Sequence, residues 1–313
     1  MNLTIAGAGV AGLCCAYELA QRGHGVTLYE QAESLNENGC SYFAGGMLAP
    51  WCERESAEEQ VLALGQQAID WWAAITNVNR GGTLVVAPQR DMAELTRFAS
   101  RTCGHEPADV KALEPALGQR RGLFFAGEAH LDPRQALKDL ARKCAELGVI
   151  LHFATPAPAT VDVNCTGLAA DLPGLRPVRG EMLYIRSRDV ALTRTVRLLH
   201  PRFPVYVVPR GDGVYMVGAT MIESNSTDAV TLRSMMELLG AVYTLHPGFA
   251  EAEILETGIG LRSAFADNLP RVQRIAGTWH VNGLYRHGYL LAPAMARQLA
   301  DRITEEITHE NYG

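Results

Sequence analysis

The sequence has few cysteines, and none of them stand in a pairing pattern. Seven cysteines occur among 313 residues, with no CxxC pair and no His/Cys cluster at metal-ligand spacing, so we expect neither a disulfide framework nor a metal site. No apolar run approaches the roughly 18–20 residues of a membrane span. The first apolar block follows no basic segment, which argues against a signal peptide. These features predict a cytoplasmic protein with reduced thiols and no membrane partner.

An excess of one charge sign is also missing. Lys and Arg number 28 against 34 Asp and Glu, giving a net charge of -6, so nothing indicates a nucleic-acid partner. We find no G-x-S-x-G nucleophile motif and no internal repeat. At 48% hydrophobic and 20% charged residues the chain is ordinary for a soluble globular protein. Its length allows one large core or two smaller ones.

The first thirty residues predict a β-α-β unit. The apolar run LTIAGAG predicts a buried strand from Leu3 to Ala6. VAGLCCAYELAQRG then has helical spacing, and Gly23 is a plausible end for that helix. HGVTLYE predicts a second buried strand. The whole has about the ~30 residues that such a unit needs.

Three glycines form G-x-G-x-x-G across the turn from strand to helix. Gly7 permits a tight turn, Gly9 lets the backbone approach a pyrophosphate, and Gly12 lets the helix pack closely on the strand. The pyrophosphate would lie at the positive end of the helix. Glu30, which ends the second strand, can accept hydrogen bonds from a ribose hydroxyl pair. An acid here favours FAD or NAD over NADP.

Small residues soon replace the regular alternation of strands and helices that an NAD-binding domain would show. A polar loop after Glu30 leads to Ser41, Ala44, Gly45 and Gly46. Small residues let backbone N–H groups crowd a flat ring such as an isoalloxazine. A plain turn from loop to helix would explain the glycines almost as well.

The later segments predict further elements. HLDPRQALKDLARKCAELGV predicts an amphipathic helix with Asp132 as N-cap and Pro133 as its first residue. ATVDVNCTG predicts a short strand, and VYVVPRGDGVYMVGATM predicts a hairpin. WHVNGLYRHGYLLAPAMARQLADRI predicts a strand, a loop over 283–288 and a helix with Pro293 near its first position. Such a helix end stabilises reduced flavin if it faces the pyrimidine edge.

Six segments together resemble the FAD-dependent D-amino-acid oxidase family, in particular its glycine oxidase branch that serves thiazole synthesis. They are GAGVAGLCCAYELAQRGHGVTLYE, SYFAGGMLAP, RPVRGEML, YVVPRGDGVYMVGATM, GLRSAF and GLYRHGYLLAPA. The likeness implies an α/β fold: a Rossmann-like FAD-binding domain with an inserted α+β antiparallel-sheet substrate domain. The FAD-binding domain is expected over 1–75, 120–175 and 255–313, and the substrate domain over 76–119 and 176–254.

The resemblance also implies an activity, the oxidative deamination of glycine or a similar small amino acid. Hydride would pass from the α carbon to flavin N5 with no side chain as acid or base. The imine would hydrolyse to a 2-oxo acid and ammonia, and dioxygen would be reduced to hydrogen peroxide. The C-terminal loop lacks the cysteine to which covalently flavinylated sarcosine oxidases attach their cofactor, so the resemblance implies non-covalent FAD. The alternatives are a dehydrogenase subunit that passes electrons to a partner, an oxidase for a larger N-substituted glycine, and a non-catalytic flavin subunit. A homo-oligomer is possible.

Four residues are candidates for binding the substrate. An arginine suits the carboxylate because its planar fork bonds bidentately, and by resemblance Arg262 takes this role. The alternative is an internal ion pair with some acid such as Glu256. By resemblance, Tyr206 helps to hold the carboxylate and Met221 walls the pocket, although either residue type on a sheet face is usually core packing. The backbone of Arg286 should touch the cofactor, while its side chain either reaches the substrate or faces solvent.

The cofactor contacts are expected in five segments. They are Gly7, Gly9, Val10, Ala11 and Gly12; Glu30 and Gln31; Ser41, Gly45, Gly46 and Met47; Thr166 and Gly167; and Arg286, His287, Gly288, Tyr289 and Leu290. His287 stands where relatives often have asparagine, and it either titrates near neutral pH or contributes only its backbone. The segment TPAPATV, which ends at Val161, is shorter than in relatives and predicts a more exposed adenine side.

Overall fold

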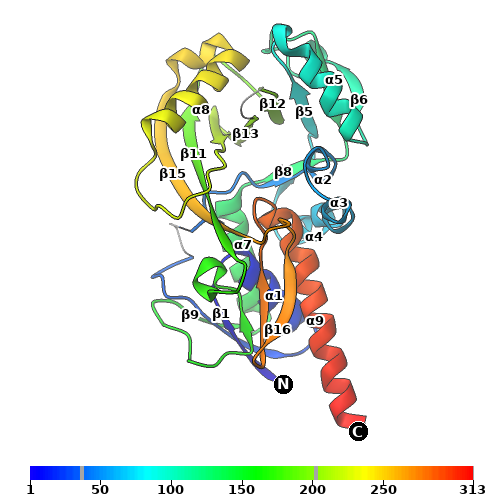
Figure 1. Cartoon of the computed structure of the whole chain (residues 1–313), viewed down its shortest axis with the longest axis vertical. Helices are drawn as coiled ribbons and strands as arrows, with labels where there is room; N and C mark the ends of the chain where they lie inside the picture. Colours follow the sequence, from blue (N-terminus) through cyan, green and yellow to red (C-terminus); the bar gives the residue numbers. More distant parts are fainter. Residues whose placement is uncertain (36–38, 201–203, 313) are drawn as a thin grey trace.

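The computed structural model describes residues 1–35, 39–200 and 204–312, and within them the strands form three sheets. In Figure 1 a six-stranded sheet with its helices occupies the lower part, and an eight-stranded sheet with α5 and α8 the upper part. The long strands β11 and β15 reach from the upper part toward the lower. None of the described helices is long and apolar enough to cross a membrane.

The six-stranded sheet contains the predicted β-α-β unit. Its strands lie in the order β16 (Arg271–Ile275), β17 (Thr278–Asn282), β10 (Val163–Asn164), β1 (Asn2–Ala6), β2 (Gly25–Tyr29) and β9 (Ile150–His152). All neighbours are parallel except β16 and β17. The buried strands predicted on either side of the first helix are confirmed. Both follow from apolar runs that two layers of helices and loops can cover.

Three long helices pack around this sheet. α1 (Val10–Gln21) contacts both α7 (Pro133–Glu146) and α9 (Gly288–Tyr312). The chain leaves α1 through Gly23, whose φ of +82° suits glycine. Asp132 caps α7, as predicted: its carboxylate accepts from the backbone N–H of Arg134 at 2.8 Å. The predicted start of the last helix is wrong, because α9 begins at Gly288 and Pro293 lies inside it.

The eight-stranded sheet runs in the order β15 (Glu253–Ala264), β11 (Arg176–Arg186), β14 (Val214–Gly218), β13 (Val205–Gly211), β12 (Thr195–Leu198), β5 (Thr83–Val86), β7 (Arg121–Phe125) and β6 (Glu106–Asp109). The predicted hairpin is confirmed as β13 and β14, which turn at Asp212 with a φ of +50°. Buried side chains of α8 (Leu232–Leu245) join the core on one face. α5 (Met92–Arg101) contributes to a second cluster.

A short sheet links the two parts. It pairs β3 (Met47–Leu48), β8 (Ala129–Leu131) and β4 (Val78–Asn79). The remaining α-helices of the described chain are α2 (Pro50–Glu53), α3 (Glu59–Gly65), α4 (Ala68–Ala73) and α6 (Val110–Leu113). β7 and most of β15 fall in segments that the sequence assigned to the FAD-binding domain, yet both pair in the eight-stranded sheet. The division into two domains therefore stays a proposal, with its boundaries crossing these strands.

Candidate functional site

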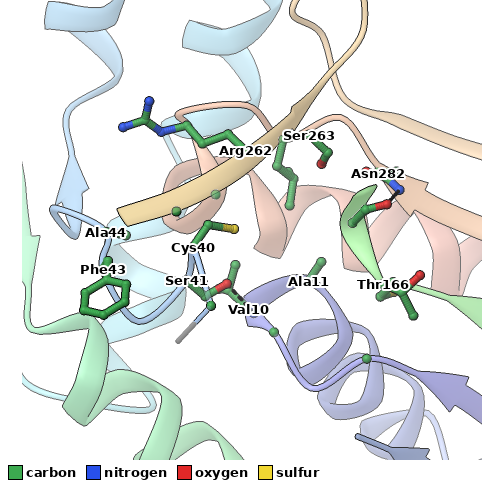
Figure 2. Close-up of a pocket in the computed structure, with 18 of the residues that line it drawn as sticks. Val10, Ala11, Cys40, Ser41, Phe43, Ala44, Thr166, Arg262, Ser263 and Asn282 are labelled. Carbon is green, nitrogen blue, oxygen red and sulfur yellow. Dashed lines mark hydrogen bonds between the residues drawn. The ribbon is translucent and has the colours of Figure 1, made fainter. Parts of the chain in front are cut away.

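A cavity of about 370 Å³ opens at the carboxyl ends of β1 and β10. Ligands of open parallel sheets bind at this edge, in front of the helix that follows the first strand. Figure 2 shows Val10 and Ala11 at the start of α1 below the cavity, with Thr166 toward one side and Arg262 toward the other. Segments from the start, the middle and the end of the chain therefore meet at one site.

The glycines of the first turn fit closely against their neighbours. Gly7 has a φ of +93°, and a Cβ there would lie 2.9 Å from the carbonyl oxygen of Cys165. A Cβ at Gly12 would overlap the carbonyl oxygen of Gly7. The predicted tight turn and close packing are therefore confirmed. Gly9 is the N-cap of α1 and has no side chain to cap the first turn. The backbone N–H of Val10 donates to the Ser41 hydroxyl at 3.1 Å, so the N–H groups that an anion can use are those that follow Val10.

Glu30 is buried at the end of β2 and lines the cavity. One carboxylate oxygen accepts from the backbone N–H of Ala8 at 2.8 Å, and the other from that of Ala32 at 3.0 Å. The two bonds fix the carboxylate, and each oxygen keeps a lone pair for a further donor. Gln31 beside it also lines the cavity. The proposed bonds to a ribose stay a prediction.

Arg262 lies on β15 and lines the other side of the cavity. Its Nη1 donates to the carbonyl oxygen of Thr220 at 3.0 Å, and it forms no ion pair with any carboxylate in the described part of the chain. Glu256, its suggested partner, instead binds Arg134 through two hydrogen bonds of 2.9 and 3.0 Å. The internal ion pair is therefore wrong, and this guanidinium keeps donors for an outside anion.

A glycine that the sequence analysis missed makes room for this guanidinium. A Cβ at Gly180, on the neighbouring strand β11, would overlap the guanidinium of Arg262. Gly180 stands in the RPVRGEML segment. That segment carried the family resemblance, but nothing in its local pattern told which residue the glycine would face.

Tyr206 lies on β13 with its ring against two glycines. A Cβ at Gly45 would come within 2.9 Å of the ring, and one at Gly218 within 3.0 Å of the hydroxyl oxygen. The residue lines the main cavity. Burial raises the pKa of Tyr206, and Arg262 acts in the opposite direction without reversing it. The phenol therefore stays protonated at neutral pH and can donate a hydrogen bond.

The other two substrate candidates, Arg286 and Met221, have different surroundings from Arg262 and Tyr206. Arg286 lines the main cavity, but its Nη2 lies 2.8 Å from Glu53 and 2.6 Å from the hydroxyl of Ser56, so its side chain does not simply face solvent. Met221 is half exposed and lines a separate cavity of about 420 Å³. Its sulfur lies 3.4 Å from the hydroxyl of Tyr285, a residue of the main cavity that the sequence analysis missed.

Most of the predicted cofactor contacts line the main cavity, and the rest lie beside it. Gly46, Met47, His287 and Leu290 line an adjoining cavity of about 50 Å³, and Gly12 lies beneath the loop of Gly7. Several lining residues were missed because nothing in their local pattern marks them as cavity residues. They are Cys40, Phe43, Ala157, Ala169, Met182, Gly260, Ser263, Asn282 and Leu284. Ala157 belongs to the shortened segment, so that segment forms part of the wall.

Comparison with known proteins identifies the family of this chain. The profile described as "FAD dependent oxidoreductase" matches residues 2–302. The chain belongs to this family. It is 54% identical to a protein of Rhizobium etli named as a thiamine biosynthesis oxidoreductase, ThiO, over 98% of the chain and 97% of that protein. It is 27% identical to glycine oxidase of Pseudomonas aeruginosa, over 96% of the chain and 94% of that enzyme.

A solved structure agrees with the fold of this family member. Glycine oxidase from Bacillus cereus superposes with a TM-score of 0.81 at 22% identity, covering 96% of each chain. The chain is thus an FAD-dependent oxidoreductase, and FAD is its cofactor. The cavity fits that group. The N-terminus of α1 behind the Gly7–Gly9 turn offers backbone donors for a diphosphate, and the fixed Glu30 carboxylate offers acceptors for a ribose.

Proposed function

We propose that the protein oxidises glycine or a similar small amino acid and serves the thiazole branch of thiamine synthesis. The products are an imine, hydrolysed to a 2-oxo acid and ammonia, and hydrogen peroxide from dioxygen. The observation that carries this proposal is the Arg262 guanidinium, which lines the cavity without a carboxylate partner in the described chain. The names of the relatives from Rhizobium etli and Pseudomonas aeruginosa support the same activity and pathway.

The residues around Arg262 suggest how the substrate is held. The guanidinium binds the substrate carboxylate through two parallel N–H donors, and the Tyr206 hydroxyl donates a third hydrogen bond. Gly45, Gly180 and Gly218 leave space where side chains would otherwise intrude. Non-covalent FAD, when bound, supplies the two-electron acceptor for the substrate. Because no side chain is assigned as acid or base, catalysis rests on positioning and on the fixed charges of the site.

Anaerobic titration of the purified holoenzyme with glycine tests this function. We expect glycine to bleach the flavin absorbance in the wild type and, under air, to yield one hydrogen peroxide per glycine consumed. Arg262→Lys should lower kcat/KM by about 100-fold, because Lys cannot hold a carboxylate with two parallel bonds. The matched control is Arg274→Lys, since Arg274 pairs with Glu306 on the surface and does not line the cavity.

Three results would contradict this proposal in different ways. If the flavin stays oxidised with glycine, sarcosine and D-alanine, the protein is not an oxidase of small amino acids. Dye reduction without hydrogen peroxide would indicate a dehydrogenase that passes its electrons to a partner. Equal losses of kcat/KM in Arg262→Lys and Arg274→Lys would show that Arg262 does not bind the substrate.

A further inference from the structure

Within the described part of the chain two arginines line the main cavity, and only one of them has a carboxylate partner. Arg262 has no carboxylate partner, as shown above. Arg286 is 2.8 Å from the Glu53 carboxylate through its Nη2, and it lines both the main cavity and the small one beside it. An amino acid that enters the cavity therefore meets one free cation and one cation that is already paired.

Glu53 is the last residue of α2 and is buried, with 7% of its surface exposed. Its carboxylate lies 2.8 Å from Arg286, 2.8 Å from Nε2 of His287 and 3.2 Å from Nη1 of Arg197. Burial alone would raise the pKa of Glu53, but these three residues outweigh it and hold the pKa well below the usual value. Glu53 is thus ionised at neutral pH.

His287 and Arg197 complete the cluster from the protein side. Burial lowers the pKa of His287, so its ring is neutral at pH 7. Its Nε2 lies 2.8 Å from the Glu53 carboxylate and 3.2 Å from Nε of Arg286. The side chain of His287 therefore has a structural partner and contributes more than its backbone. Arg197 is buried, lies over the ring of Phe98 and lines neither cavity. The only cation of the cluster that reaches the pocket is Arg286, in the described part of the chain.

We infer that Glu53 selects amino acids with a single carboxylate by cancelling the charge of Arg286 at the pocket wall. A substrate with a second acidic group would place that group next to Arg286 and Glu53. It would find no free donor fork there and would face a like charge, which costs affinity. A monocarboxylate needs only Arg262 and avoids this penalty. The inference rests on the proposed function, because it assigns the substrate carboxylate to Arg262.

Binding of small anions tests the inference without turnover. Acetate and malonate, which carry one and two carboxylates, are titrated into the oxidised holoenzyme while the flavin spectrum is followed. We expect malonate to bind the wild type at least about tenfold more weakly than acetate. In Glu53→Gln, which keeps the shape but not the charge, that ratio should fall by roughly tenfold. Glu59→Gln is the matched control, since Glu59 pairs with Arg54 on the surface.

Turnover supplies a second measurement with glycine, sarcosine and iminodiacetate, which is glycine with a carboxymethyl group on nitrogen. Sarcosine enlarges the amine without adding charge, so it separates size from charge. Glu53→Gln should raise kcat/KM for iminodiacetate relative to sarcosine by roughly tenfold. A ratio unchanged from the wild type would overturn the inference.

The outcomes separate the two claims. If no amino acid reduces the flavin but the anion ratios behave as expected, the proposed reaction fails and the role of Glu53 stands. If glycine is oxidised and the wild type binds malonate as tightly as acetate, the role of Glu53 fails and the reaction stands. This wild-type measurement also decides the matter should Glu53→Gln fail to fold.

Discussion

The indole Nε1 of Trp72 donates a hydrogen bond of 2.8 Å to the carbonyl oxygen of Tyr289. In a regular helix that carbonyl would accept from the residue four positions later, which here is Pro293 and has no N–H. Trp72 is fully buried on α4, and its ring also packs on the ring of Tyr289. A tryptophan from another helix thus replaces the missing backbone donor in α9 and fixes the helix end that lines the cavity.

This relationship predicts a non-additive pair of substitutions. Trp72→Phe should destabilise the protein by about 1–3 kcal/mol, because it leaves a buried carbonyl without a donor. Pro293→Ala restores a helical N–H, so it should recover part of the loss in the Trp72→Phe background. Thermal unfolding of the four proteins of the cycle measures the coupling. Simple additivity would show that Pro293 and Trp72 do not serve the same carbonyl.

Gly12 should tolerate no side chain. Gly12→Ala forces a methyl group onto the carbonyl oxygen of Gly7, so the loop must move and FAD content should fall sharply. Gly240→Ala is the matched control, because Gly240 is on α8 with open space around it. The control should gain roughly 0.5–1 kcal/mol of stability. FAD content follows from the absorbance ratio of the purified proteins. Equal content in both variants would contradict the predicted tight fit.

Glu128 should make the protein less stable as pH rises from about 5 to 8. It is 1% exposed, accepts from the backbone N–H of Cys52 at 2.7 Å, and burial raises its pKa from 4.5 to about 7. Between these values the folded protein keeps a proton that the unfolded chain has lost, so stability decreases with pH. The loss is on the order of 3 kcal/mol above pH 7, since one pKa unit corresponds to about 1.4 kcal/mol.

The test for Glu128 compares the wild type with Glu128→Gln by chemical unfolding at pH 5 and pH 8. The variant cannot ionise, so its stability relative to the wild type should rise by up to that amount at pH 8. Glu146→Gln serves as the control, because Glu146 is on the surface of α7. A difference that is the same at both pH values would show that Glu128 is ionised in the folded protein at pH 5 as well.

Arg134 should be irreplaceable by lysine. Its guanidinium lies 4.2 Å from the ring centre of Tyr42 and 4.3 Å from that of Tyr184, and it binds Glu256 with two bonds. Lysine offers neither a planar group for the rings nor a fork for the carboxylate. We expect Arg134→Lys to cost about 1–3 kcal/mol in thermal unfolding. Arg142→Lys, on the exposed face of the same helix, should change stability by less than about 0.5 kcal/mol.

The local parts of this fold were readable from the sequence because their signals are local. The first strand, α1 and its glycine turn follow from an apolar run and a fixed glycine spacing, and the cap of α7 follows from Asp132 and Pro133. The start of α9 was misread for a physical reason. A proline usually marks a first turn, but here a tertiary donor, Trp72, lets the helix begin five residues earlier.

The parts of the site that were missed depend on contacts between distant segments. Glu53 and Arg286 stand 233 residues apart, and no periodicity links them. The space for Arg262 comes from Gly180 on a neighbouring strand, and strand register cannot be deduced from one sequence. The family resemblance placed Arg262 and Tyr206 beside one cavity, but it gave no account of Arg286 and its partner.

The order of strands in the six-stranded sheet affects when, during translation, the sheet can be completed. The two-residue strand β10 lies between β1 and β17, and β17 ends only at Asn282. During translation the opening β-α-β unit emerges first, and β10, the strand that pairs with β1, follows at Val163–Asn164. β17 pairs with β10 and follows only at Thr278–Asn282. Because the cavity is lined by residues from Ala6 to Tyr289, we expect a nascent chain to bind FAD fully only after Tyr289 has been added.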